Sequence, residues 1–224
     1  MPCKLTKGTH MNRHALLVTL LFTLSGITLA DPIEDALRPI QDEWAIIKYR
    51  TPEKQHEARY HALAQQAHKL TLAHPDAAAP LIWEGIVLSS EAGAKGGLGA
   101  LALAKVARER LEHAIQRDER ALKGSALTSL GTLYAKVPGW PIGFGDNKKA
   151  DALLQKAVAI NPDGIDSNFF RGEYLHEHER HNEALKHLET ALRAPARPGR
   201  ELADNGRRQE IQTLITKIRK ELEP

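Results

Sequence analysis

Apolar residues recur at helical spacing along most of the chain after residue 30. Alternation of apolar and β-branched residues, which would indicate a strand, never runs for five residues. Ala, Leu, Glu, Lys and Arg, which favour helix, dominate the same region. The pattern therefore predicts an all-α protein.

Two helices are predicted at the start of this region. The first runs from Asp31-Pro32 to about Lys48. Its apolar stripe contains Ile33, Leu37, Ile40, Trp44 and Ile47. Thr51 before Pro52 predicts an N-cap with proline at the first helical position. The second helix is expected to end near His74-Pro75.

A repeat of about 34 residues follows, in which small and apolar residues return at fixed positions. Each unit is expected to hold two helices. Residues 165–198 match the pattern without a gap, with Pro195 one place early. The matching residues are Gly172, Leu175, Ala184, Leu188 and Ala191. Glycine and alanine let paired helices approach closely, and large apolar residues fill the remaining space.

Two earlier units carry insertions. Residues 124–164 match with seven extra residues between the helices. Their matching residues are Leu127, Leu130, Gly131 and Tyr134, then Ala150, Leu154, Ala157 and Pro162. Residues 78–121 match through Leu81, Gly85, Leu88, Ala107, Leu111 and Ala114. Their insertion is glycine-rich at 93–99, and Glu84 stands where an apolar residue is usual, which weakens this unit.

These positions resemble the tetratricopeptide repeat family over roughly residues 50–198. The resemblance implies a helical solenoid of about three units, in which each helix pair covers the next. The chain is broken after it by Arg197-Pro-Gly-Arg200. An amphipathic helix from about Ala203 to Leu222, within residues 199–224, is expected to cap the solenoid.

Residues 1–30 have the pattern of a secretory signal peptide. Lys4, Lys7 and Arg13 are followed by an apolar core at 15–24 and by the small-residue cleavage site 28–30. An uncleaved anchor is the alternative, and Met11 is an alternative start. Cleavage leaves a domain of residues 31–224, expected to be exported and soluble in a bacterial periplasm. The one cysteine, Cys3, precedes the apolar core, so neither a lipid anchor nor a disulfide is expected.

The predicted signal peptide is basic, whereas the rest of the chain carries equal numbers of basic and acidic residues. Residues 1–30 hold three of the 31 Lys and Arg residues and none of the 28 Asp and Glu residues. The mature chain therefore has equal numbers of both signs. No basic face for nucleic acid is expected.

The stretch 137–146, Val-Pro-Gly-Trp-Pro-Ile-Gly-Phe-Gly-Asp, interrupts the helical pattern. Its prolines and glycines exclude helix, and Asp146 is placed to cap the helix that follows. The loop nevertheless carries Trp140, Pro141, Ile142 and Phe144. Either these aromatic rings tuck onto the solenoid, or they line a groove or pore for an apolar ligand or a partner.

Candidate chemistry is sparse. The string from His176 through His178 to His181 is not the His-Glu-x-x-His motif of zinc proteases. His178 and His181 are three apart, so metal binding is the alternative, but a solvated turn and helix end are expected there. Gly97-x-Gly99 follows a helix and not the strand that a dinucleotide loop requires. No Ser/His/Asp or Cys/His set can be named. We expect no catalytic residue, no metal site and no cofactor.

Four arginines gather near the predicted cap helix: Arg197, Arg200, Arg207 and Arg208. Glu201, Asp204 and Glu210 lie among them. These charges either compensate one another at the surface, or Arg197 and Arg200 bind a carboxylate of a ligand or partner.

Three strings extend the family resemblance: residues 137–146, Ile160-Asn-Pro-Asp-Gly-Ile165 and Ala194-Pro-Ala-Arg-Pro-Gly-Arg200. Together they resemble the tetratricopeptide-type component associated with TRAP transporters, the TatT component family. The resemblance implies a periplasmic solute-binding protein as partner, possible homo-oligomers, and a groove or pore for small hydrophobic solutes. The chain departs from the lipoprotein members in lacking a lipid-attachment cysteine.

The sequence thus favours a non-enzymatic exported scaffold for protein–protein interaction, accessory to a solute-binding protein of a TRAP-type transporter. Two alternatives remain at this point. One is a periplasmic binder of small apolar organic ligands, and the other is an adaptor in envelope assembly.

Overall fold

The computed structural model describes Met1 and residues 32–223. The predicted signal peptide lies outside the described residues, apart from Met1. Among the helices of the described part, none combines the length and the apolar character needed to cross a membrane.

The all-α prediction is confirmed, because residues 32–223 contain helices and no strand. The α-helices are α1 (Pro32–Arg50), α2 (His56–Ala73), α3 (Ala78–Lys95), α4 (Gly97–Asp118), α5 (Ser125–Lys136), α6 (Asn147–Ile160), α7 (Ile165–Glu177), α8 (His181–Leu192) and α9 (Glu201–Glu221). Two short 3-10 helices cover Glu53–Gln55 and Ala121–Gly124.

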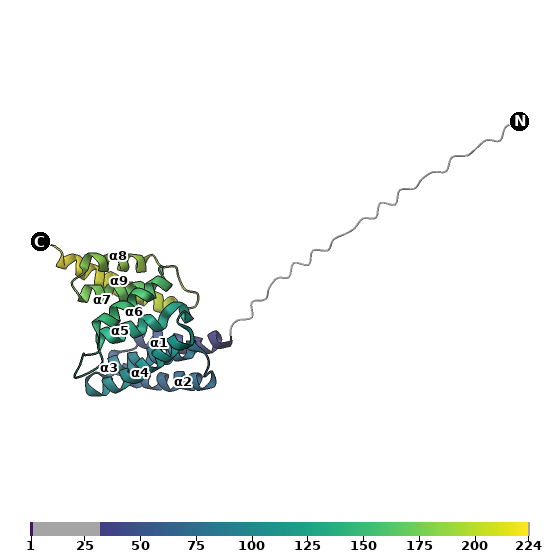
Figure 1. Ribbon diagram of the computed structural model, residues 1–224, viewed down its shortest axis with the longest axis horizontal. Helices are drawn as coiled ribbons and strands as arrows, with labels where there is room; N and C mark the ends of the chain where they lie inside the picture. Colours follow the sequence, from purple (N-terminus) through teal and green to yellow (C-terminus); the bar gives the residue numbers. More distant parts are fainter. Residues whose placement is uncertain (2–31, 224) are drawn as a thin grey trace. The chain divides into compact units, whose positions relative to one another are not determined.

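The three predicted units correspond to the helix pairs α3/α4, α5/α6 and α7/α8. In Figure 1 these pairs follow one another from the lower to the upper part of the domain. One glycine in the first helix of each pair faces a leucine of the second helix. A Cβ atom added to any of these glycines would clash with the facing leucine. Its distance to the leucine Cγ would be 2.7 Å for Gly85 and Leu111, 2.8 Å for Gly131 and Leu154, and 2.7 Å for Gly172 and Leu188. The second helices also bury their repeat alanines completely: Ala107, Ala114, Ala150, Ala157, Ala184 and Ala191.

The two insertions take different forms. Between α5 and α6 the extra residues form the loop 137–146, as predicted. Between α3 and α4 the expected glycine-rich connection at 93–99 is wrong in extent, because α3 continues to Lys95 and α4 begins at Gly97. Gly96, with a φ of 66°, supplies the left-handed turn between them. The insertion therefore lengthens two helices.

The predicted cap at Thr51 is also wrong. The Thr51 hydroxyl donates to the Ile46 carbonyl oxygen at 3.1 Å and so satisfies an acceptor in the last turn of α1. A 3-10 turn follows Pro52, and α2 begins only at His56. The hydroxyl therefore completes the helix before it and not the helix after it.

Glu84, which departs from the repeat pattern, is buried and forms an ion pair. Its side chain is 3% exposed, and its Oε1 accepts from Arg110 Nε at 2.8 Å and from His68 Nδ1 at 2.9 Å. A buried carboxylate is tolerable when it is paired in this way. An ion pair therefore takes the place of apolar contact at this position.

The last helix packs on α7 and α8, in agreement with the predicted cap, and it also meets the first helix. The Tyr49 ring of α1 lies against Gly206 of α9, where a Cβ atom would be 2.4 Å from it. α1 also packs on α3, where Trp44 Nε1 donates to Ser90 Oγ at 2.9 Å. The first helix therefore links both ends of the repeat array.

Candidate functional site

The loop 137–146 is closed at its base by backbone hydrogen bonds. The Gly145 N–H donates to the Pro138 carbonyl at 2.9 Å, and the Asp146 N–H donates to the Tyr134 carbonyl at 3.0 Å. At the tip, the Gly139 carbonyl accepts from the N–H groups of both Ile142 and Gly143 at 3.1 Å. These bonds give the loop one defined path between α5 and α6.

Two glycines are required for this path. A Cβ atom at Gly145 would lie 1.9 Å from the Val137 carbonyl oxygen, and one at Gly143 would lie 2.4 Å from the Pro138 carbonyl oxygen. No other residue allows the two sides of the loop to approach so closely.

The exit of the loop is fixed as predicted. Asp146 is the N-cap of α6, and its Oδ1 accepts from the Lys149 N–H at 3.0 Å. The side chain satisfies one of the N–H groups that have no partner within the helix.

Phe144 anchors the loop to the solenoid. Its ring lies edge-to-face with Tyr134 of α5 at 5.6 Å, and the Arg108 guanidinium of α4 lies 4.5 Å from its centroid. Gly143 packs close to Leu101 of α4: a Cβ atom added to this glycine would lie 3.3 Å from Leu101 Cδ1. The loop of one unit therefore packs on the lengthened helix of the preceding unit, so the two insertions form one structure.

Trp140 and Ile142 face solvent. Trp140 is 90% exposed and Ile142 is 66% exposed, while Pro141 between them is also exposed. Phe144 therefore tucks onto the solenoid, as the first of the two alternatives expects, whereas Trp140 projects into solvent. A groove, ligand or partner at Trp140 stays a prediction.

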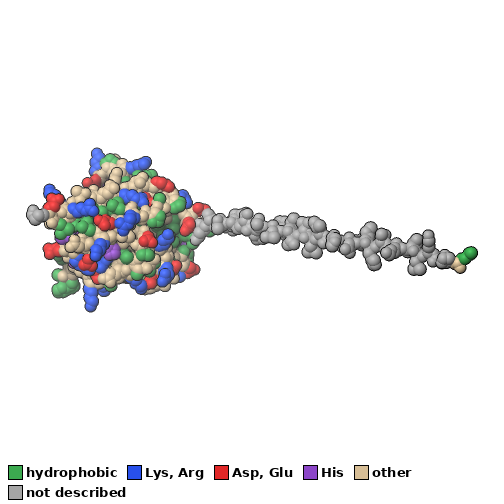
Figure 2. Space-filling view, turned by 90° about the horizontal axis from the view of Figure 1, so that it is seen from above, with side chains coloured by type: hydrophobic (Ala, Val, Ile, Leu, Met, Phe, Trp, Pro, Cys, Tyr) green, Lys and Arg blue, Asp and Glu red, His purple; other side chains and the backbone are tan. Residues whose placement is uncertain are grey.

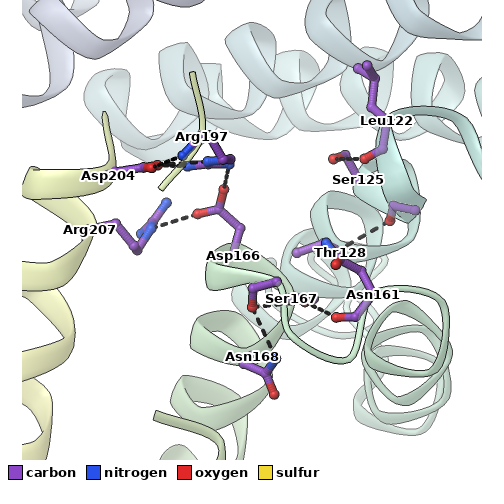
Figure 3. A network of polar contacts seen from close by, with 12 residues as sticks. Leu122, Ser125, Thr128, Asn161, Asp166, Ser167, Asn168, Arg197, Asp204 and Arg207 are labelled. Carbon is purple, nitrogen blue, oxygen red and sulfur yellow. Dashed lines mark hydrogen bonds and ion pairs between the residues drawn. The ribbon is translucent and has the colours of Figure 1, made fainter. Parts of the chain in front are cut away.

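Of the arginines near the cap helix, Arg197 and Arg207 form ion pairs within the described part of the chain and Arg200 forms none there. Arg197 is held by carboxylates, with Nη1 2.8 Å from Asp166 Oδ2 and Nη2 2.6 Å from Asp204 Oδ1 (Figure 3). Arg207 pairs with the other oxygen of Asp166 at 2.9 Å and with Glu210 at 2.6 Å. These two guanidinium groups are used to join α7 to α9 and to the turn before it.

The chemistry of Asp166 reflects this pairing. Burial raises the pKa of its carboxyl group, but the guanidinium groups of Arg207 and Arg197 outweigh burial and lower that pKa to about 2. The Arg207 guanidinium also lies 4.4 Å from the Phe169 centroid and 4.6 Å from that of Phe170. Sequence reasoning grouped Arg207 with other surface charges and missed Asp166, because their interaction spans 41 positions.

Arg200 lies outside these ion pairs. Its guanidinium lies 5.0 Å from the Trp83 centroid, and no carboxylate of residues 32–223 pairs with it. It lines a cleft of about 300 Å³ between α1 and the start of α9, together with Asp42, Ile46, Arg50 and Leu202. Burial and the nearby Arg197 lower the pKa of Arg200.

The structure does not bring the loop and this cleft together. Phe144 contacts Tyr134 in the last turn of α5, whereas Asp166, which holds Arg197, lies in the first turn of α7. α5 and α7 are the first helices of successive pairs that share the same glycine–leucine contact, so they run in the same direction. The last turn of α5 and the first turn of α7 therefore lie at opposite ends of these helices, separated along the helix direction by about 18 Å, the length of a 12-residue helix. The aromatic loop and the arginines are therefore separate candidate sites.

The face drawn in Figure 2 carries interspersed Lys or Arg and Asp or Glu side chains. No region of a single sign stands out on that face. It offers nucleic acid no continuous basic surface.

The comparisons with known proteins bear on the fold. No protein-family model matches the sequence, and no curated protein matches it. The crystal structure of TTC0263, a thermophilic TPR protein in Thermus thermophilus, superposes with a TM-score of 0.57 at 18% identity, covering 83% of this chain and 80% of that one. The fold is a tetratricopeptide-like solenoid. The crystal structure of MamA covers 63% of this chain and 91% of its own at 17% identity, and its TM-score of 0.33 is too low to support an argument.

The tetratricopeptide resemblance is thus confirmed at the level of the fold. The solenoid consists of helix pairs whose contact positions are those that the repeat pattern predicted. The TatT-type resemblance stays a prediction.

Proposed function

We propose that the chain is a non-enzymatic exported adaptor that binds another protein through Trp140 and Ile142. The observation that carries this proposal is the 90% exposure of Trp140 on a loop whose path is fixed by hydrogen bonds and close-packed glycines. A tryptophan ring exposed to water gains free energy when a partner covers it, and tryptophan is a frequent binding hot spot.

Preorganisation strengthens the case. A rigid loop loses little conformational freedom when a partner covers it, so more of the contact energy is realised as affinity. Phe144 and Asp146 hold the loop on one side of the exposed segment, which leaves Trp140, Pro141 and Ile142 presented at its tip. These three residues form the proposed contact surface, called here the loop tip.

The loop tip is an addition to the fold. The pair α7/α8 has the same glycine and leucine contact as α5/α6, yet only residues 178–180 separate its helices. A connection as long as 137–146 is therefore unnecessary for packing a pair. This supports a role in recognition.

The proposed partner is a periplasmic solute-binding protein of a TRAP-type transporter. Export rests on the signal-peptide pattern of residues 1–30, and the partner rests on the TatT-type resemblance of residues 137–146, 160–165 and 194–200. An envelope-assembly adaptor would use the same surface with a different partner.

A direct binding measurement tests this proposal. The mature chain is titrated with a purified solute-binding protein encoded beside its gene, using calorimetry. Trp140→Ala and Ile142→Ser are expected to weaken binding at least about tenfold. Leu72→Ser is the matched control, because Leu72 is also 66% exposed but lies on α2. Unchanged affinity in a folded Trp140→Ala variant would refute the loop assignment.

The cleft at Arg200 supports a second candidate function, the binding of a small organic carboxylate. Among residues 32–223 no carboxylate lies close enough to the Arg200 guanidinium to form an ion pair, and apolar groups of Ile46 and Leu202 line the same cleft beside Asp42 and Glu201. Native mass spectrometry and tryptophan fluorescence with a panel of fatty and aromatic acids test it, because Trp83 adjoins Arg200. A response that disappears in Arg200→Gln is expected, and no response across the panel would contradict it.

A further inference from the structure

Three potential metal ligands meet where the last three helices come together. His176 lies at the end of α7, His181 begins α8, and Glu221 ends α9. The Nδ1 atoms of the two histidines are 3.2 Å apart, and Glu221 Oε2 is 3.6 Å from His176 Nδ1. One ligand atom from each residue lies within 4.8 Å of the others.

These separations fit coordination of a common ion. Two ligands bound tetrahedrally at the usual Zn–N distance are about 3.3 Å from each other. The two Nδ1 atoms have nearly this separation. The Glu221 oxygen at 3.6 Å is too far from His176 Nδ1 for a hydrogen bond, yet it needs only a small shift to become a third ligand.

A hydrogen bond between the imidazoles explains less of the arrangement. It would use one Nδ1–H and one unprotonated Nδ1, at a distance at the long end of the usual range. It would also leave Glu221 Oε2 only a 3.6 Å ion pair with His176, beyond hydrogen-bond distance. A metal ion employs all three groups at once.

The surroundings suit a bound ion that is accessible to solvent. The His176 side chain is 10% exposed, whereas that of Glu221 is 39% exposed, so water can complete the coordination. Lys217 lies 3.9 Å from the other Glu221 oxygen, Oε1, and leaves Oε2 for the ion. His178 is separate, because its Nδ1 donates to the Tyr174 carbonyl at 2.8 Å.

We propose that His176, His181 and Glu221 bind a divalent transition-metal ion, for which Zn²⁺ is the best match. Two imidazoles and one carboxylate are ligands that Zn²⁺ accepts, and water occupies the fourth position. The ion fastens the C-terminal end of α9 to the last helix pair. The sequence predicts a solvated turn at the histidines, because Glu221 lies far along the chain from them and does not enter the local pattern.

The test is Zn²⁺ binding to the full chain without an affinity tag, measured by competition with a chromophoric chelator. One ion per chain is expected. His176→Ala, His181→Ala and Glu221→Gln should each weaken binding at least about tenfold. His113→Ala is the control, because His113 is an exposed histidine of α4 and should leave affinity unchanged.

Two further readouts separate binding from folding. Zn²⁺ should raise the Tm of the unchanged protein and leave that of His181→Ala in place, while circular dichroism shows that both are helical. Co²⁺ should give the intense visible absorption of a tetrahedral site. Absence of saturable binding, or binding unaffected by both His181→Ala and Glu221→Gln, would overturn the proposal.

Discussion

The guanidinium of Arg108 lies 4.5 Å from the ring centroid of Phe144, and this contact joins the loop of one repeat to the helix of another. Arg108 belongs to α4, which the first insertion lengthens, and Phe144 belongs to the second insertion. The two insertions are therefore in contact with each other's structural elements. The contact between Arg108 and Phe144 holds the base of the loop on α4, while the loop tip stays exposed to solvent.

Phe144→Ala should destabilise the protein, whereas Trp140→Ala should not. Loss of the half-buried Phe144 ring removes contacts with Tyr134 and Arg108 and should lower the free energy of unfolding by about 1–2 kcal/mol. Trp140 is 90% exposed, so its removal should change that free energy by less than about 0.5 kcal/mol. Urea denaturation of the two variants measures the difference, and equal losses would contradict the division of the loop.

Gly172→Ala should destabilise the last helix pair by about 1–3 kcal/mol, because the new Cβ atom would lie 2.7 Å from Leu188 Cγ and 3.2 Å from the Ala184 carbonyl oxygen. Gly93→Ala is the control. Gly93 lies within α3 with nothing within 4 Å of a Cβ atom, so alanine there should stabilise by about 0.5–1 kcal/mol. Thermal unfolding should show Tm shifts of opposite sign. A tolerated alanine at 172 would argue against the close crossing of α7 and α8.

Arg207→Ala should cost about 3 kcal/mol, because it leaves the Asp166 and Glu210 carboxylates without their shared guanidinium. Arg207→Lys should recover only part of this loss, since an ammonium group cannot reach both carboxylates and stack on Phe169 in the same way. Chemical denaturation is the measurement, with exposed Arg193→Ala as the neutral control. Full rescue by lysine would show that charge alone matters.

Lowering the pH should remove the contribution of Asp166 to the free energy of unfolding. Its pKa in the folded protein is about 2 against an ordinary value of 3.8, so its stabilisation is complete above pH 3.8 and is lost as the pH falls toward 2. The side chain is 35% exposed, and after allowance for solvent screening the effect is about 1 kcal/mol. The difference in unfolding free energy between the unchanged protein and Asp166→Asn should therefore stay constant above about pH 4 and shrink as the pH falls from 3.8 toward 2. A constant difference across this range would contradict the assignment.

The repeat framework could be predicted because its signals are local. Gly172, Ala184 and Leu188 stand at fixed positions within one unit, and close helix crossing demands these residue types there. The cap at Asp146 was predictable for the same reason, since its partner is the N–H group three residues later.

Other features depend on residues far apart in the sequence. Glu84 is paired with Arg110 from the opposite helix, so the sequence alone made it look like a defect. The contact of α1 with α9, and the pairing of Asp166 with Arg207, form only once helices far apart in the sequence have packed together. The exposure of Trp140 beside an anchored Phe144 likewise depends on the loop path, which composition does not specify.

The most direct test of the proposed adaptor function places a photoreactive amino acid at position 140 in the full chain, expressed in the organism that encodes it. Position 72, on α2, carries the same amino acid as the control. Illumination should give one crosslinked product from position 140, which mass spectrometry identifies as a periplasmic solute-binding protein, and Ile142→Ser should diminish it. No product from position 140, or the same product from position 72, would contradict the central claim.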